Sequence, residues 1–143
     1  MTATDLAQII EHSHRALDAF MKGDAGPAKA LFSRRDDVTL ANPFGPAARG
    51  WSQVEPTLER AAAHYRDGEA TGFERISEYA TAELAYIVEV EQLRAKVGGA
   101  DASTPLALRV TTIFRREDGV WKIVHRHADP ITAPRPAESI LPH

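Results

Sequence analysis

Cysteine is absent from this chain of 143 residues. Its absence excludes disulfide scaffolds, zinc sites built on thiolates and cysteine nucleophiles. A strong charge of one sign is also missing, because 17 Lys and Arg residues face 20 Asp and Glu residues and leave a net charge of -3. A nucleic-acid binder that neutralises many phosphates is therefore not expected. No stretch comes near the roughly 18 apolar residues of a membrane span, so we expect no membrane partner.

The apolar residues that are present suffice for one buried core. They make up 43% of the chain and charged residues 26%, a balance typical of a globular protein. The length suits one domain, and we expect it over residues 1–130, with a Pro-rich extended tail over residues 131–143. Residues 1–14 hold no basic segment that leads into an apolar one, so we expect a cytoplasmic protein.

Hydrophobic periodicity divides the chain into a largely helical first part and a strand-rich second part. Apolar residues at helical spacing predict a helix over residues 4–22 and another that begins near Trp51 and stops at Gly68. Pro27 favours the first turn of a short helix between them. Alternation of period two predicts five strands, at residues 37–42, 69–80, 84–97, 106–117 and 120–129.

The last two strands are joined by Asp118-Gly119, a pair typical of a two-residue hairpin turn of type I′. Glu117 then pairs with Val120, and continuing this register brings nine side chains to one face of the hairpin. Because this face is mainly apolar, we expect it to point toward the helices. The nine residues are Leu108, Val110, Thr112, Phe114, Trp121, Ile123, His125, His127 and Asp129.

The same argument, applied to residues 84–97, places Tyr86, Val88 and Val90 inward and the carboxylates of Glu89 and Glu91 outward. The outer face would then carry these acids together with apolar and basic residues. Such a mixed face suits a homodimer interface, although an ordinary solvated sheet face has a similar composition. The basic and apolar residues expected on the outer face include Arg109, Ile113, Arg115, Val124 and Arg126.

Helices followed by a curved antiparallel meander predict an α+β fold. A cone-shaped sheet would wrap around the N-terminal helices, with one closed apolar end and one open end. Concavities of this kind are where small molecules bind.

Four motifs stand out along the chain: Leu31-Phe32 before Asp36-Asp37-Val38, then Asn42-Pro43-Phe44-Gly45, then Arg49-Gly50-Trp51, and finally residues 114–127 with Asp118-Gly119-Val120-Trp121. Together they resemble the nuclear-transport-factor-2-like superfamily, which includes ketosteroid isomerases, SnoaL-like polyketide cyclases and the association domain of calmodulin-dependent kinase II. The closing Asp-Gly-x-Trp-x-x-Val-His-x-His is most similar to the association domain. The resemblance implies a cystatin-like cone over about residues 5–130.

The resemblance also identifies one reaction that the residues argue against. Ketosteroid isomerases carry a catalytic Asp before a Pro-x-Gly motif, and here Asn42 holds that position. The positions that correspond to their oxyanion donors fall near Ala16 and Thr112. A neutral amide takes no proton from carbon, and the developing oxyanion would lack its donors. Steroid isomerisation is therefore not expected.

His125, His127 and Asp129 alternate along the expected inner face of the last strand, and we predict them as catalytic residues. They suit an acid/base pair or an anchor for a polar ligand. Two other interpretations stay open. His125 would be a core histidine bonded to Thr112 or a backbone carbonyl while Asp129 caps the strand, or the His-x-His pattern would bind a metal. We expect no metal and no cofactor.

Two functions from different classes follow. The first is a SnoaL-like homodimer whose pocket binds a small organic molecule and serves a non-steroid isomerase, cyclase or hydrolase reaction. The alternative is a non-catalytic association domain with a residual pocket. Whether the chain is an enzyme stays open. The residues expected to contact a ligand are Asn42, Phe44, Trp51, Tyr65, Tyr86 and Thr112.

Overall fold

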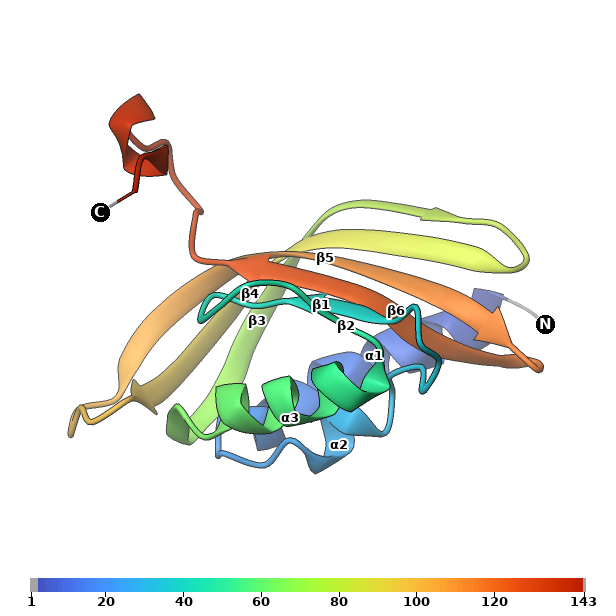
Figure 1. Ribbon diagram of the computed structural model, residues 1–143, viewed down its shortest axis with the longest axis horizontal. Coiled ribbons are helices and arrows are strands. Elements are labelled where there is room, and N and C mark those ends of the chain that lie inside the picture. The colour runs from blue at the N-terminus through green and yellow to red at the C-terminus, as the bar shows by residue number, and fades with distance from the viewer. Residues whose placement is uncertain (1–2, 143) are drawn as a thin grey trace.

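A computed structural model describes residues 3–142 and confirms the α+β fold. The three α-helices lie together, and a long β-meander follows the last of them (Figure 1). The elements are α1 (Ala3–Phe20), α2 (Gly26–Lys29), β1 (Thr39–Ala41), β2 (Ala48–Arg49), α3 (Trp51–Ala62), β3 (Tyr65–Ala80), β4 (Leu84–Val97), β5 (Thr104–Glu117), β6 (Val120–Asp129) and a final 3-10 turn η1 (Ala137–Ile140).

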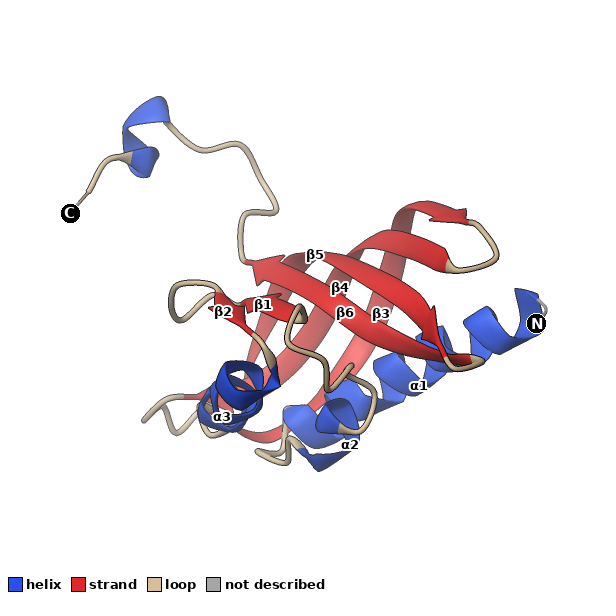
Figure 2. Ribbon diagram, turned by 45° about the vertical axis from the view of Figure 1, so that its right-hand side comes forward, coloured by secondary structure: helices blue, strands red, loops and turns tan. Residues whose placement is uncertain are grey.

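The six strands form one sheet in the order β2-β1-β6-β5-β4-β3. Strands β3 to β6 pair as the predicted antiparallel meander. The sheet is nevertheless mixed, because β1 lies parallel to β6 and β2 pairs antiparallel with β1 at the edge. The sheet bends over α1, α2 and α3, which all lie on its concave side (Figures 1 and 2).

Three register shifts between β3 and β4 accompany this curvature. A β-bulge adds a residue to one strand and increases its bend and twist. Gly68 lies in the first shift, where a Cβ would collide with the carbonyl of Arg94 and with Ala95. The prediction of Gly68 as a helix stop is therefore wrong. Helix α3 ends at Ala62, and the glycine serves the close approach of β3 and β4.

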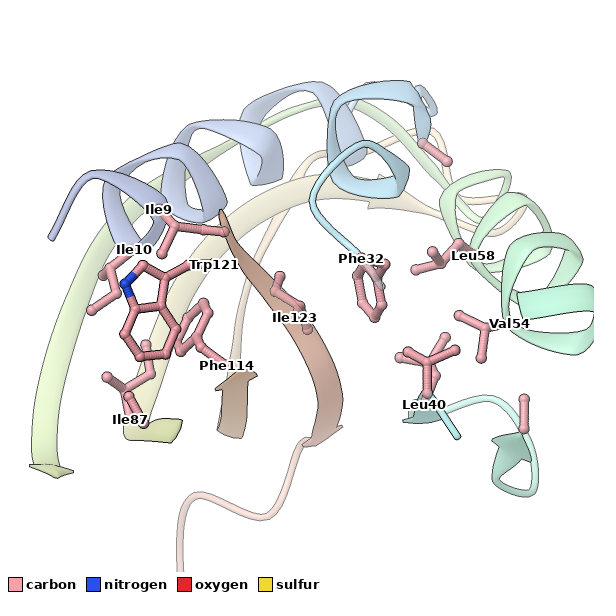
Figure 3. Close-up of a cluster of buried hydrophobic side chains, with 14 of the residues drawn as sticks. Ile9, Ile10, Phe32, Leu40, Val54, Leu58, Ile87, Phe114, Trp121 and Ile123 are labelled. Atoms are coloured by element: carbon pink, nitrogen blue, oxygen red, sulfur yellow. The ribbon is translucent and has the colours of Figure 1, made fainter. Parts of the chain in front are cut away.

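The core between helices and sheet consists of two clusters. Figure 3 shows the first, in which Ile9 and Ile10 of α1 pack near Trp121 and Phe114. Phe32, Leu40, Val54 and Leu58 continue this cluster toward α3. The second cluster comprises Leu17, Met21, Tyr65, Leu93, Ala95, Leu108, Val110 and Ala128.

The chain beyond β6 leaves the sheet and extends away from it, carrying η1 at its end (Figures 1 and 2). The side chains of Ile140 and Leu141 are exposed there. Within residues 3–142, no helix has the length and apolar character needed to cross a membrane.

Candidate functional site

The hairpin between β5 and β6 starts as predicted. Asp118 and Gly119 have φ angles of 52° and 82°, as a type I′ turn requires, and Glu117 pairs with Val120.

The register changes after Phe114 and Ile123, which still lie opposite each other. The next pair joins Ile113 to His125, so Val124 has no residue opposite it. From this β-bulge onward, each side chain of β6 lies on the face opposite to the predicted one, because side chains alternate with a period of two.

The predicted inward orientation of His125, His127 and Asp129 is therefore wrong. These residues lie opposite Ile113, Thr111 and Arg109 rather than opposite Thr112, Val110 and Leu108, and they occupy the outer face. Arg126 and Ala128 face inward in their place.

The outer-face residues bind one another and their neighbours. His125 Nδ1 lies 2.7 Å from Thr39 Oγ1, and His127 Nε2 lies 3.2 Å from Asp129 Oδ2. Asp129 accepts hydrogen bonds from Arg109 Nε at 2.7 Å and from the Ile131 amide at 3.0 Å. Asp129 thus caps the strand end, as one of the interpretations left open above expected, but that interpretation is wrong in placing His125 in the core against Thr112, since its ring contacts Thr39. The catalytic role of His125, His127 and Asp129 stays a prediction, and none of the three lines the cavity described below.

These contacts also shift proton affinities. Burial, together with the charge of His127, lowers the pKa of His125. Burial raises the pKa of Asp129, but the hydrogen bonds from Arg109 and the Ile131 amide outweigh it, so the pKa is lowered overall. Asp129 therefore stays a carboxylate held by its partners.

Strand β4 is also inverted relative to the prediction. Glu89 and Glu91 are only 3% and 2% exposed and point toward the helices, while Tyr86 is 38% exposed on the other face. Hydrophobicity alone failed here because the buried carboxylates have cationic partners on other elements.

Glu89 lies between α1 and β3. One of its oxygens lies 2.8 Å from His14 Nε2, and the other accepts a hydrogen bond from Arg75 Nε at 2.8 Å. The His14 ring stacks on Phe73 with their centroids 3.7 Å apart. Burial raises the pKa of Glu89, but the hydrogen bonds from His14 and Arg75 outweigh it and lower the pKa overall. His14 was missed as a partner because its position lies at the edge of the helical stripe.

Glu91 binds Arg126, which reaches across β5 from β6. The guanidinium donates two hydrogen bonds to the carboxylate, at 2.8 and 2.7 Å. Burial lowers the pKa of Arg126, but the charge and hydrogen bonds of Glu91 outweigh it, so the pKa is raised. The two charges in the centre of the sheet therefore compensate each other.

A cavity of about 60 Å³ lies between the two core clusters and opens beside Phe44. Its walls come from α1, α2, α3 and the inner face of the sheet, and they are mostly apolar. The polar side chains among them are those of Ser13, Asn42, Tyr65 and Arg126. The apolar walls include Leu17, Phe20, Phe32, Leu40, Leu58, Leu93, Leu108 and Ile123.

Three of these four polar groups already have partners. Ser13 donates to the Ile10 carbonyl at 2.7 Å, and the Asn42 side-chain oxygen accepts a hydrogen bond from the Phe44 amide at 2.9 Å. Arg126 is held by Glu91. The NH₂ group of Asn42 remains as a donor.

Tyr65 differs from them. It is 4% exposed, and its hydroxyl has no hydrogen-bond partner among residues 3–142. Burial raises its pKa to about 12, with smaller opposing effects from Arg126 and Glu91. The hydroxyl is therefore a neutral group at physiological pH, able both to donate and to accept a hydrogen bond.

Of the six predicted ligand contacts, Asn42, Phe44 and Tyr65 line this cavity. Thr112 is buried on the inner face but lies outside the cavity walls. Trp51 packs against the first core cluster and lies under the Arg34 guanidinium, 4.1 Å from it. Tyr86 is on the outer face and stacks on Tyr79. Neither Trp51 nor Tyr86 contacts the cavity.

A second, wider hollow of about 640 Å³ adjoins the cavity on the side of α3 and the loop that joins β1 to β2. Asn42, Phe44 and Ala61 line both spaces. The Phe44 ring is in contact with the His64 ring, at a centroid distance of 4.5 Å, and lies 5.8 Å from the Tyr65 ring. Phe44 thus stands between the two spaces. No group of three or more metal-ligating side chains occurs in the part of the chain that the structure describes.

An α+β domain whose helices pack against a curved six-stranded mixed sheet is the fold of the nuclear-transport-factor-2-like proteins. Residues 9–133 match the SnoaL-like domain family, and the chain belongs to this family. No curated protein matches the chain.

Solved structures share the fold at low sequence identity. A nuclear transport factor 2-like superfamily protein from Salmonella enterica is 19% identical, with a TM-score of 0.74 and full coverage of both chains (100% of each). A ketosteroid isomerase-like protein from Erwinia carotovora is 20% identical, with a TM-score of 0.72 over 92% of this chain and 100% of that one. A Thiobacillus denitrificans protein named after the calcium/calmodulin-dependent protein kinase type II association domain is 21% identical, with a TM-score of 0.68 over 87% of this chain and 93% of that one.

Proposed function

We propose that this protein binds a small, largely apolar organic molecule in the cavity under the sheet. The observation that carries this proposal is Tyr65, whose side chain lines an apolar cavity and whose hydroxyl forms no hydrogen bond within residues 3–142. The hydroxyl is not fully enclosed, so a group in the cavity can reach it, and polar groups in apolar surroundings normally have a hydrogen-bond partner. A ligand with a carbonyl or hydroxyl oxygen would supply that partner.

The charges around the cavity favour an uncharged group at this inner position. Arg126 is the only charged residue among the described cavity walls, and Glu91 already neutralises it through both oxygens. An additional buried charge would find no compensating partner there. Tyr65 and the free NH₂ group of Asn42 are suited to a neutral oxygen.

The cavity supports binding more directly than proton transfer. Among the described residues of its walls there is no Asp, Glu or His, and Asn42 occupies the place of the isomerase base. A carbon acid needs such a base within hydrogen-bond reach. We therefore propose a binding protein rather than a non-steroid isomerase, cyclase or hydrolase that uses a base from these walls.

Two variants test this function with a neutral ligand such as 4-(4-hydroxyphenyl)butyramide, measured by titration calorimetry. Ala128→Leu adds three carbon atoms to a cavity of about 60 Å³ and should abolish binding. The control Ala107→Leu makes the same change on the opposite face of the neighbouring strand. Tyr65→Phe should weaken the amide about tenfold, because it removes the free hydroxyl. Equal binding by the parent and Ala128→Leu would contradict the proposal.

The outer face of the sheet favours a second role, the association of two copies. Tyr79 and Leu84 are 60% and 50% exposed there and, with Tyr86, Val88 and Ile113, line an apolar hollow. Exposed apolar patches of this kind mark interaction surfaces, and a two-fold axis would bring the patch onto its own copy. We propose a homodimer, as expected from the sequence.

The molecular mass by light scattering tests this association. We expect a dimer, and Tyr86→Lys should shift it toward the monomer, while Val120→Lys at the β5–β6 turn should not. A ring of many subunits would instead support the association-domain alternative, and a monomer at every concentration would refute both.

A further inference from the structure

The hollow beside the cavity is large enough to hold part of a ligand. Ligand pockets in proteins span about 300–1,000 Å³, so a cavity of about 60 Å³ holds only a fragment of a typical ligand. The hollow encloses about 640 Å³ and shares Asn42, Phe44 and Ala61 with the cavity. A ligand anchored at Tyr65 would therefore extend past Phe44 into the hollow.

The hollow differs from the cavity in its chemistry. It is lined by one face of α3 and by the loop after β1, and its polar side chains include Ser52, Gln53, Thr57, Arg60 and His64. Among its described walls there is no Asp or Glu. The hollow therefore presents a cation and several neutral hydrogen-bonding groups without a competing carboxylate.

Arg60 is the fixed positive charge of this surface. Its guanidinium donates one hydrogen bond, to Thr57 Oγ1 at 3.1 Å, and forms no ion pair within residues 3–142. The neighbouring acids of α3, Glu55 and Glu59, lie on another face of the helix, where both bind Lys29 at 3.3 and 2.7 Å. Arg60 thus keeps most of its five N–H donors free for a ligand.

We propose that the ligand is an amphipathic acid. Its apolar body, with the neutral oxygen that binds Tyr65, lies in the cavity, and its anionic head group, a carboxylate or a phosphate monoester, lies in the hollow against Arg60. Guanidinium groups bind both anions through paired hydrogen bonds. This inference rests on the proposed function, since it extends the same site outward.

A ligand that occupies both the cavity and the hollow must pass Phe44, which lines both spaces. Its side chain is 45% exposed, and it contacts the His64 ring on one side and faces the Tyr65 ring on the other. The next residue, Gly45, has no atom within 4 Å of the position of a Cβ. The loop therefore has open space at Gly45, the neighbour of Phe44 in the chain.

Calorimetric titration with three matched ligands tests the proposal: 4-(4-hydroxyphenyl)butyrate, its primary amide and 4-(4-hydroxyphenyl)butyl phosphate, whose phenol oxygen can meet Tyr65 while the head group reaches the hollow. At low ionic strength we expect at least one of the two anions to bind the parent protein about fivefold more tightly than the amide. The stronger anion identifies the head group. In Arg60→Gln this advantage should vanish, while binding of the amide stays within twofold.

Arg94→Gln is the control, because it removes the same charge from an exposed position on β4. It should leave the preference for the anion intact. Equal affinity of acid, phosphate and amide for the parent would overturn the inference while leaving the proposed function standing, provided that Ala128→Leu still abolishes amide binding. An equal loss in Arg60→Gln and Arg94→Gln would also overturn it, since net charge alone would then explain the preference. If none of the three ligands binds, both proposals fail.

Discussion

The buried ion pair between Glu91 and Arg126 can be tested by changing one atom. Glu91→Gln keeps the shape of the side chain but removes its charge. In the parent protein both carboxylate oxygens accept hydrogen bonds from Arg126, and the Glu91 side chain is 3% exposed. The substitution leaves the guanidinium without its counter-charge in the centre of the sheet.

The expected cost follows from this burial. Removing one partner of a buried pair costs about 3–5 kcal/mol, because the remaining charge is desolvated without compensation. The Arg126 side chain is 19% exposed, and the charge of Glu89 also acts on it, so we expect the lower end, about 3 kcal/mol. Replacing both residues by Leu removes both charges and should recover most of this loss.

Urea unfolding, followed by circular dichroism, measures these free energies. The control is Glu11→Gln, which removes an acid from the exposed Glu11–Arg15 pair of α1 and should cost no more than about 0.5 kcal/mol. A cost below about 1 kcal/mol for Glu91→Gln would refute the reasoning, and so would a Leu-Leu double variant as unstable as the single one. The first result would mean that the pair is better solvated than its burial indicates, and the second that the loss does not come from an uncompensated charge.

Three further predictions concern other positions. The pKa of Tyr65 is about 12 in the folded state and about 10 in an unfolded chain, so its contribution is complete below pH 10 and is lost as the pH rises toward 12. Relative to Tyr65→Phe, the parent should lose about 2–3 kcal/mol of stability over that range in urea unfolding, and identical pH profiles would contradict this. Gly68→Ala should cost about 1–3 kcal/mol because of its contact with the β4 backbone, whereas Gly72→Ala, in open space on the same strand, should be neutral or stabilising; equal melting temperatures would argue against the close approach. His127→Ala should leave the affinity for 4-(4-hydroxyphenyl)butyramide within twofold, and a tenfold loss would show that the outer face takes part in binding.

Local sequence signals predicted most of the elements. The apolar stripe of α1 and the alternation of β3 to β6 identified them, because burial on one side of a helix or sheet repeats at 3.6 or two residues. The turn at Asp118-Gly119 and its register were also predictable, because two adjacent positive φ angles restrict the residue types strongly. Of the site, Asn42, Phe44 and Tyr65 were identified.

The bulge at Val124 had no sequence signal of its own, and it decided which side chains of β6 face the ligand. Likewise, the inward direction of Glu89 and Glu91 depended on hydrogen-bond donors supplied by α1, β3 and β6.

The sequence by itself determined the fold class, the order of the elements and the family, because these depend on patterns repeated over many residues. Only the tertiary structure decided that Arg126, rather than His125 and His127, faces the cavity. A single unpaired residue reverses every later side chain of a strand, and a buried charge is stable only where a partner from a distant segment meets it.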